Sequence, residues 1–106
     1  MRIEAAAVPL MEGALQYVRD KQVPGGTGRN RDFLLSSSTS EEARVRIKAE
    51  ISRDLTTLLF DPQTSGGLFA AVPTDRVAEV REALNDQDVD SWVVGEVVEG
   101  RGVEVV

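Results

Sequence analysis

The sequence contains no cysteine and no histidine, and only one Trp, one Tyr and three Phe occur among its 106 residues. Without cysteine there are no disulfides and no thiolate chemistry, and without histidine there is no imidazole base and no zinc site of the usual ligands. Long apolar runs and a charged-then-apolar leader are also missing, so the sequence predicts neither a membrane span nor a signal peptide. We therefore expect a cytoplasmic protein.

Positive charge is in short supply as well. The sequence has 12 Lys and Arg and 18 Asp and Glu, which gives a formal net charge of -6. Binding to nucleic acid or to an anionic membrane needs clustered Lys and Arg, so we expect neither as a partner. The remaining composition, 42% hydrophobic and 28% charged, is typical of a globular protein, and the length predicts a single domain over residues 1–106.

The chain is organised around residues 58–73, LLFDPQTSGGLFAAVP. Asp61 and Pro62 favour a turn and should end the helix that arrives through residues 55–60. Gly66 and Gly67 permit positive φ or a close approach, and their amides could hold an anion. Alternatively, the glycines only reverse the chain before the strand expected over residues 68–72. That strand lacks alternation, so we expect it to be covered on both faces or to be central to the sheet.

A second glycine-rich stretch, VPGGTGRN, occupies residues 23–30. We expect a loop that no helix runs through, followed by a short extended piece at 32–35 and a polar loop at 36–40. Its amides and Arg29 could face a phosphate or another domain, or the loop could be a flexible surface connection. The stretch matches neither a Walker A loop nor a dinucleotide fingerprint.

The other predicted elements follow from periodicity and capping residues. The expected strands and helices are a strand at 2–8, a helix from Pro9 to about Lys21, a strand at 44–51, a helix capped by Ser52, a helix capped by Thr74 with Val77, Val80, Ala83 and Leu84 inward, and a hairpin of strands 92–98 and 102–106. Gly95 indicates a bulge or a close backbone contact, and acidic residues 86–90 are expected to be solvated. This order predicts an α+β fold, one layer of mixed or mostly antiparallel sheet with helices packed on one face.

Three strings, VPGGTGRN, LLFDPQTSGGLFAAVP and VVGEVV, together with the opening EAAAVPLMEGAL, resemble the C-terminal domain of selenophosphate synthetase (selenide, water dikinase). That family is similar to aminoimidazole ribonucleotide (AIR) synthetase, whose C-terminal domain is an α+β layer of this kind. The resemblance covers nearly all of residues 1–106. It implies synthesis of selenophosphate from selenide, ATP and water, with Mg2+ and usually K+, by a homodimer.

The sequence also departs from the family. The N-terminal domain, with its catalytic Cys or selenocysteine, its Lys and the aspartates for Mg2+ and ATP, has no counterpart here. We therefore expect a fragment without catalytic residues, metal site or cofactor of its own, inactive alone, whose partners are the missing N-terminal domain and a second subunit. The alternative is a stand-alone anion-binding or protein-interaction module of the same fold.

The resemblance places the reaction cleft between the two domains, and the glycine-rich stretches supply the candidates for its surface. These are Gly25, Gly26, Thr27, Arg29, Asn30, Thr64, Ser65, Gly66 and Gly67. Hydroxyls and amides could bind a phosphate-like anion and Arg29 adds charge, whereas a purely structural role is the alternative. Asp61 is expected to cap the turn and Glu96 to face solvent. If φ at Gly66 is positive, its replacement by Val should cost more than about 1 kcal/mol.

Overall fold

The computed structural model describes residues 1–36 and 44–106, so most of the polar loop predicted at 36–40 lies outside the described residues. The elements, in chain order, are β1 (Arg2–Ile3), η1 (Ala5–Ala7), α1 (Ala14–Arg19), α2 (Gly25–Leu35), β2 (Val45–Ile47), α3 (Arg53–Leu59), η2 (Thr74–Arg76), α4 (Val77–Asn85), β3 (Gly95–Glu96) and β4 (Val103–Val105). No helix in these two ranges is long and apolar enough to span a membrane.

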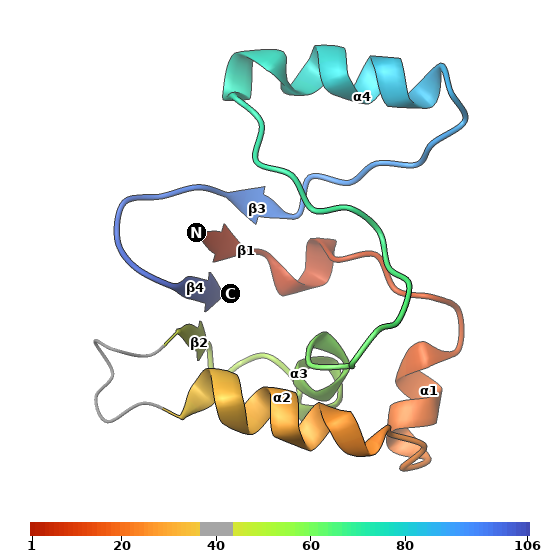
Figure 1. Ribbon diagram of the computed structural model, residues 1–106, viewed down its shortest axis with the longest axis vertical. Coiled ribbons are helices and arrows are strands. Elements are labelled where there is room, and N and C mark those ends of the chain that lie inside the picture. Colours follow the sequence, from red (N-terminus) through yellow and green to blue (C-terminus); the bar gives the residue numbers. More distant parts are fainter. Residues whose placement is uncertain (37–43) are drawn as a thin grey trace.

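The described strands form one mixed sheet in the order β2-β4-β1-β3 (Figure 1). β1 is antiparallel to β3, and β4 is parallel to both β1 and β2. The predicted α+β class is confirmed, and of the two sheet types expected, the mixed one applies. The predicted 92–98/102–106 hairpin is wrong, because β1 lies between β3 and β4. The Glu104 amide donates to the Met1 carbonyl at 2.9 Å, and the Val106 amide donates to the Ile3 carbonyl at 2.9 Å.

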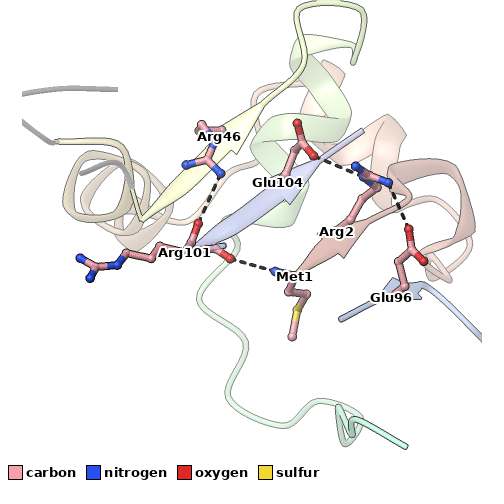
Figure 2. Close-up of polar contacts among 7 residues, drawn as sticks. Met1, Arg2, Arg46, Glu96, Arg101 and Glu104 are labelled. Atoms are coloured by element: carbon pink, nitrogen blue, oxygen red, sulfur yellow. Dashed lines mark hydrogen bonds and ion pairs between the residues drawn. The ribbon is translucent and has the colours of Figure 1, made fainter. Parts of the chain in front are cut away.

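Arg2 on β1 contacts side chains on both neighbouring strands. Its guanidinium donates to Glu104 on β4 at 3.3 Å and to Glu96 on β3 at 3.1 Å, so one cation links three strands (Figure 2). Gly95 permits the close approach of β3: a Cβ there would lie 2.9 Å from the Ile3 Cα and would overlap the Arg2 carbonyl oxygen. The close backbone contact predicted for Gly95 is therefore confirmed.

The helix α2 differs most from the predicted structure. Residues 23–30 were expected to form a loop and 32–35 an extended piece, but Gly25–Leu35 is one helix. Pro24 occupies the N-cap position with φ -58° and ψ 143°, and the residues that follow are all helical up to Leu35. Each glycine inside a helix costs about 1 kcal/mol relative to Ala. Contacts with the segment after α3, described below, offset that cost.

The other helices follow the prediction more closely. Ser52 caps α3, since its Oγ accepts from the Leu55 amide at 3.2 Å, and the helix ends before Asp61 as expected. α1 begins only at Ala14, because Gly13 adopts φ 80° and interrupts the helix expected from Pro9. Thr74 does not cap α4 but opens the 3-10 turn η2 behind Pro73.

Strand lengths were overestimated at several places. The strand expected at 2–8 turns into the 3-10 helix η1 after Ile3, and the strand expected at 44–51 is confined to β2. Residues 68–72 form no strand, and residues 68–71 are exposed rather than covered: Leu68 is 103% and Phe69 is 61% exposed. On α4, Val77, Val80 and Leu84 are half-buried as expected, but Ala83 is exposed.

The helices α1, α2 and α3 pack together, and α2 also contacts β2, whereas α4 lies beyond β3 and is joined to the rest by two long connections (Figure 1). Among the described residues the buried apolar core consists of Ala5, Phe60 and Val105. The accessible surface is 8444 Å², against about 5,800 Å² for a compact monomer of 11.5 kDa. The radius of gyration of 15.3 Å likewise exceeds the roughly 12.9 Å expected for this length. The chain is therefore less compact than a monomer of this size usually is.

Candidate interdomain site

The two glycine-rich stretches, residues 23–30 (the first glycine segment) and 61–67 (the second glycine segment), lie against each other. A Cβ on Gly26 would lie 2.8 Å from the Pro62 Cγ and 3.2 Å from the Pro62 Cβ, so the first turn of α2 approaches Pro62 as only glycine allows. One turn further on, the Asn30 side-chain amide donates to the Phe60 carbonyl at 3.0 Å. That carbonyl lies just after α3, where the last carbonyls of a helix lack partners within it. Gly26 and Asn30 therefore fix the start of the second glycine segment.

Thr27 lies on the buried side of α2. Its side chain is only 4% exposed, and its Oγ1 has no hydrogen-bond partner among the residues that the structure describes. An unpartnered buried hydroxyl costs about 1–3 kcal/mol. Thr27 thus faces the interior of the chain, whereas Gly25 and Arg29 are on the exposed side.

Thr64, Ser65, Gly66 and Gly67 are all exposed. The φ angle of Gly66 lies outside the left-handed region, and a Cβ there would meet only the flexible end of the Gln63 side chain, at 2.7 Å. A Cβ on Gly67 would meet nothing within 4 Å. The condition for a strained Gly66 is therefore not met, and the stability cost expected for its replacement does not apply. Within this chain neither glycine is required by the backbone.

A shallow, mainly apolar groove of about 250 Å³ adjoins both glycine segments. Tyr17 and Val18 of α1, Leu58 of α3, and Pro24 and Asp61 are among its lining residues. The groove follows the junction of α1 and α3, which the ion pair between Arg19 and Asp54 also joins at 3.3 Å. Asp61 thus lies at the edge of this groove and is half-buried.

The most developed polar cluster lies elsewhere, on the sheet. The ion pairs of Arg2 with Glu104 and Glu96 raise the pKa of the Arg2 guanidinium above its usual value, mainly through the hydrogen bond to Glu104. Glu96 remains 62% exposed, in keeping with the solvent-facing position expected for it. The Met1 amino group donates to the Gly102 carbonyl at 3.1 Å, and Arg46 donates to the Arg101 carbonyl at 3.3 Å (Figure 2). These contacts hold strand ends together.

Both glycine segments were predicted from the sequence, but their contact and the cluster around Arg2 were not. Both depend on residues distant in sequence, Gly26 with Pro62 and Arg2 with Glu104. In residues 1–36 and 44–106 no group of three or more Asp, Glu, His or Cys side chains is arranged to hold a metal ion. The described site thus offers amides, hydroxyls, one exposed arginine and an apolar groove.

The chain is similar in sequence to one protein family and to several enzymes of one name. The family described as AIR synthase related protein, C-terminal domain, matches residues 26–106. The chain is 41% identical over 107 residues to the selenide, water dikinase of Bordetella bronchiseptica, covering 99% of this chain and 28% of that protein. It is 41% identical over 100 residues to the enzyme of the same name from Pelobacter propionicus, covering 93% and 27% respectively. With the selenide, water dikinase of Escherichia coli K12 the identity is 34% over 101 residues, covering 95% and 26%. The chain therefore spans about a quarter of the length of these relatives.

Proposed function

The chain belongs to the family of AIR synthase related protein C-terminal domains, and from this membership we propose that it serves as the C-terminal domain of a selenide, water dikinase. In the proposed enzyme, selenide, ATP and water yield selenophosphate, AMP and phosphate. The single observation that carries the proposal is the 41% identity over 99% of the chain to an enzyme of that name. The intact enzyme would work as a homodimer, and this chain would supply scaffold and one wall of the cleft between the domains.

The packing of the two glycine segments supports the role as a cleft wall. Gly26 and Asn30 hold the residues around Pro62 in place from one side. The second glycine segment then continues into solvent with the amides of Gly66 and Gly67 and the hydroxyls of Thr64 and Ser65 exposed. Such groups bind phosphate-like anions without needing a side-chain base. We propose that they face the substrate phosphates, with Arg29 adding positive charge.

A role for Mg2+ and K+ belongs to the intact enzyme. In the described ranges no group of three or more Asp, Glu, His or Cys side chains converges. In the proposed enzyme those ions would neutralise charge at the phosphates. What this chain contributes is orientation of the anion and exclusion of water from one side of the cleft.

The large open surface supports a domain that is covered in its working state. The accessible surface of 8444 Å² exceeds the expectation for a compact monomer by roughly 2,600 Å². A stable interface typically buries about 800 Å² on each partner. The excess is thus large enough for contacts with the rest of an enzyme.

A domain exchange tests the proposal. The chain would replace the matching 28% of the Bordetella bronchiseptica enzyme, and AMP release and selenophosphate formation would be measured with ATP, Mg2+, K+ and selenide. We expect activity from the folded chimera and none above background from the isolated chain. A folded, dimeric chimera without activity would contradict the proposal, as would turnover by the isolated chain.

A further inference from the structure

Arg44, which directly precedes β2, is held against an aromatic ring on the surface of α2. Its guanidinium carbon lies 4.5 Å from the centre of the Phe33 ring, and Phe33 is 63% exposed. The Arg44 carbonyl also accepts from the Val103 amide at 2.8 Å, so the backbone at the base of the side chain is fixed. A guanidinium that stacks on a ring still has N–H donors for an anion. Arg44 is therefore a pre-ordered donor for a carboxylate.

Arg29 extends this surface along α2. It lies four positions before Phe33, so the two side chains are neighbours on the same side of the helix, and both are exposed. Neither Arg29 nor Arg44 forms an ion pair with a residue that the structure describes, whereas three other arginines do. The helix itself carries two arginines and one acidic residue, Asp32. Arg29, Phe33 and Arg44 (the arginine face) thus offer cations to a partner.

Negative charge gathers at the C-terminal end of α4. Glu82, Asp88 and Asp90 (the acidic hollow) are exposed and line a polar hollow of about 490 Å³. Arg81 is the only cation among the described lining residues, and its Nε donates to the Ser91 Oγ at 3.5 Å. The end of a helix at this terminus favours positive charge, yet the last turn of α4 contains no basic residue. A cation that entered the hollow would therefore be stabilised.

The two surfaces belong to a larger division of charge along the chain. Residues 19–53 contain eight Lys or Arg and five Asp or Glu, whereas residues 54–100 contain two and ten, respectively. From this complementarity we infer that two copies of the chain associate, with the arginine face of each copy against the acidic hollow of the other. The inference does not rest on the proposed function.

The shape of the molecule allows both contacts to form at once. α2 and α4 lie towards opposite ends of the longest axis, along which the molecule extends 40 Å (Figure 1). A two-fold axis perpendicular to that direction places α2 of each copy beside α4 of the other. Such a pair is closed, so association stops at the dimer.

Surface area and net charge are compatible with this dimer. The accessible surface of 8444 Å² exceeds that of a compact monomer by roughly 2,600 Å², and a standard interface needs about 800 Å² on each partner. The charge of -6 on each copy opposes association. Salt screens that repulsion beyond about 10 Å, whereas paired side chains lie much closer together. An unrelated acidic partner would occupy the arginine face alone, but a second copy satisfies both surfaces.

Sedimentation velocity over a series of protein concentrations tests the inference on the chain itself. We expect a monomer–dimer equilibrium. Arg44→Glu and Asp90→Arg should each weaken the dimer by about tenfold or more, because each substitution opposes two like charges. Arg53→Glu is the matched control, since Arg53 is exposed at the start of α3, outside both surfaces, and its replacement changes the net charge as Arg44→Glu does. The control should dimerise as the unaltered chain does.

A mixture of the two weakened variants provides the sharpest test. In a mixed pair the introduced carboxylate faces the introduced guanidinium, and the unaltered Arg44 faces the unaltered Asp90. The mixture should therefore dimerise about tenfold more tightly than either variant alone. Far-ultraviolet circular dichroism verifies that each variant is folded. A chain that stays monomeric at every concentration, weakened variants that dimerise as the control does, or a mixture no tighter than its components would each overturn the inference.

Discussion

Replacement of Gly26 by Ala tests the contact that joins the two glycine segments. The added methyl group would lie 2.8 Å from the Pro62 Cγ and 3.2 Å from the Pro62 Cβ, both closer than carbon atoms normally approach. The proline ring is rigid, so relief requires α2 or the start of the second glycine segment to move. Such a movement would also stretch the 3.0 Å hydrogen bond from Asn30 to the Phe60 carbonyl.

Two opposing effects set the magnitude. Ala is favoured over Gly within a helix by roughly 0.5–1 kcal/mol. Forcing a methyl group into a filled contact costs typically about 1–3 kcal/mol. Gly28 provides the matched control, because it lies in the same helix and a Cβ there would meet nothing within 4 Å. The helix preference is common to both variants, so Gly26→Ala should be less stable than Gly28→Ala by about 1–3 kcal/mol.

Thermal and urea unfolding, followed by circular dichroism at 222 nm, measure this difference. For a chain of this size each kcal/mol shifts the melting temperature by about 4–8 °C. Gly28→Ala should melt at or above the temperature of the unaltered chain and Gly26→Ala clearly below Gly28→Ala. Equal melting temperatures for the two variants would show that a Cβ at position 26 does not disturb the contact with Pro62.

Substitutions at three further positions have distinct expected outcomes. Gly95→Ala should destabilise the chain by about 3 kcal/mol or more, because the new methyl group overlaps the Arg2 carbonyl; an unchanged urea midpoint would disprove that contact. Ser52→Ala should lower the free energy of unfolding by about 1 kcal/mol, because the hydrogen bond to the Leu55 amide is lost. Ser52→Asp should retain most of the stability, because Asp also caps helices. Equal losses for both variants would argue against capping. Gly66→Val should change the unfolding free energy of the isolated chain by less than about 0.5 kcal/mol. The same substitution should lower AMP release by the chimera. A large loss of stability would show a backbone role that the φ angle of Gly66 does not indicate.

Local chemistry allowed part of this structure to be predicted. The cap at Ser52, the end of α3 before Pro62 and the close contact at Gly95 each depend on a few neighbouring residues or on one special residue type. The α2 helix was missed because three glycines in its first four residues argue against a helix, and only the contacts with Pro62 and Phe60 compensate. Those contacts come from residues some 30 positions away, which periodicity does not reveal.

The sheet order was missed for a related reason. Strands that are neighbours in sequence usually pair, so a hairpin of β3 and β4 was the natural expectation. The insertion of β1 places Arg2 between Glu96 and Glu104, and this arrangement becomes visible only once the register is known. For the candidate site, the residue types were recognised from the sequence, but the burial of Thr27 and the exposure of residues 64–67 required coordinates.

The position of β1 has a consequence for biosynthesis. Arg2 and its partner Glu104 are separated by 102 positions, so β1 can pair with its parallel neighbour β4 only after the residues between them have been made. Until then the apolar residues next to β1 remain available to chaperones and to other nascent chains. Shortening the chain by the few residues of β4 would remove the strand that joins β1 to β2, and the sheet would separate into two parts.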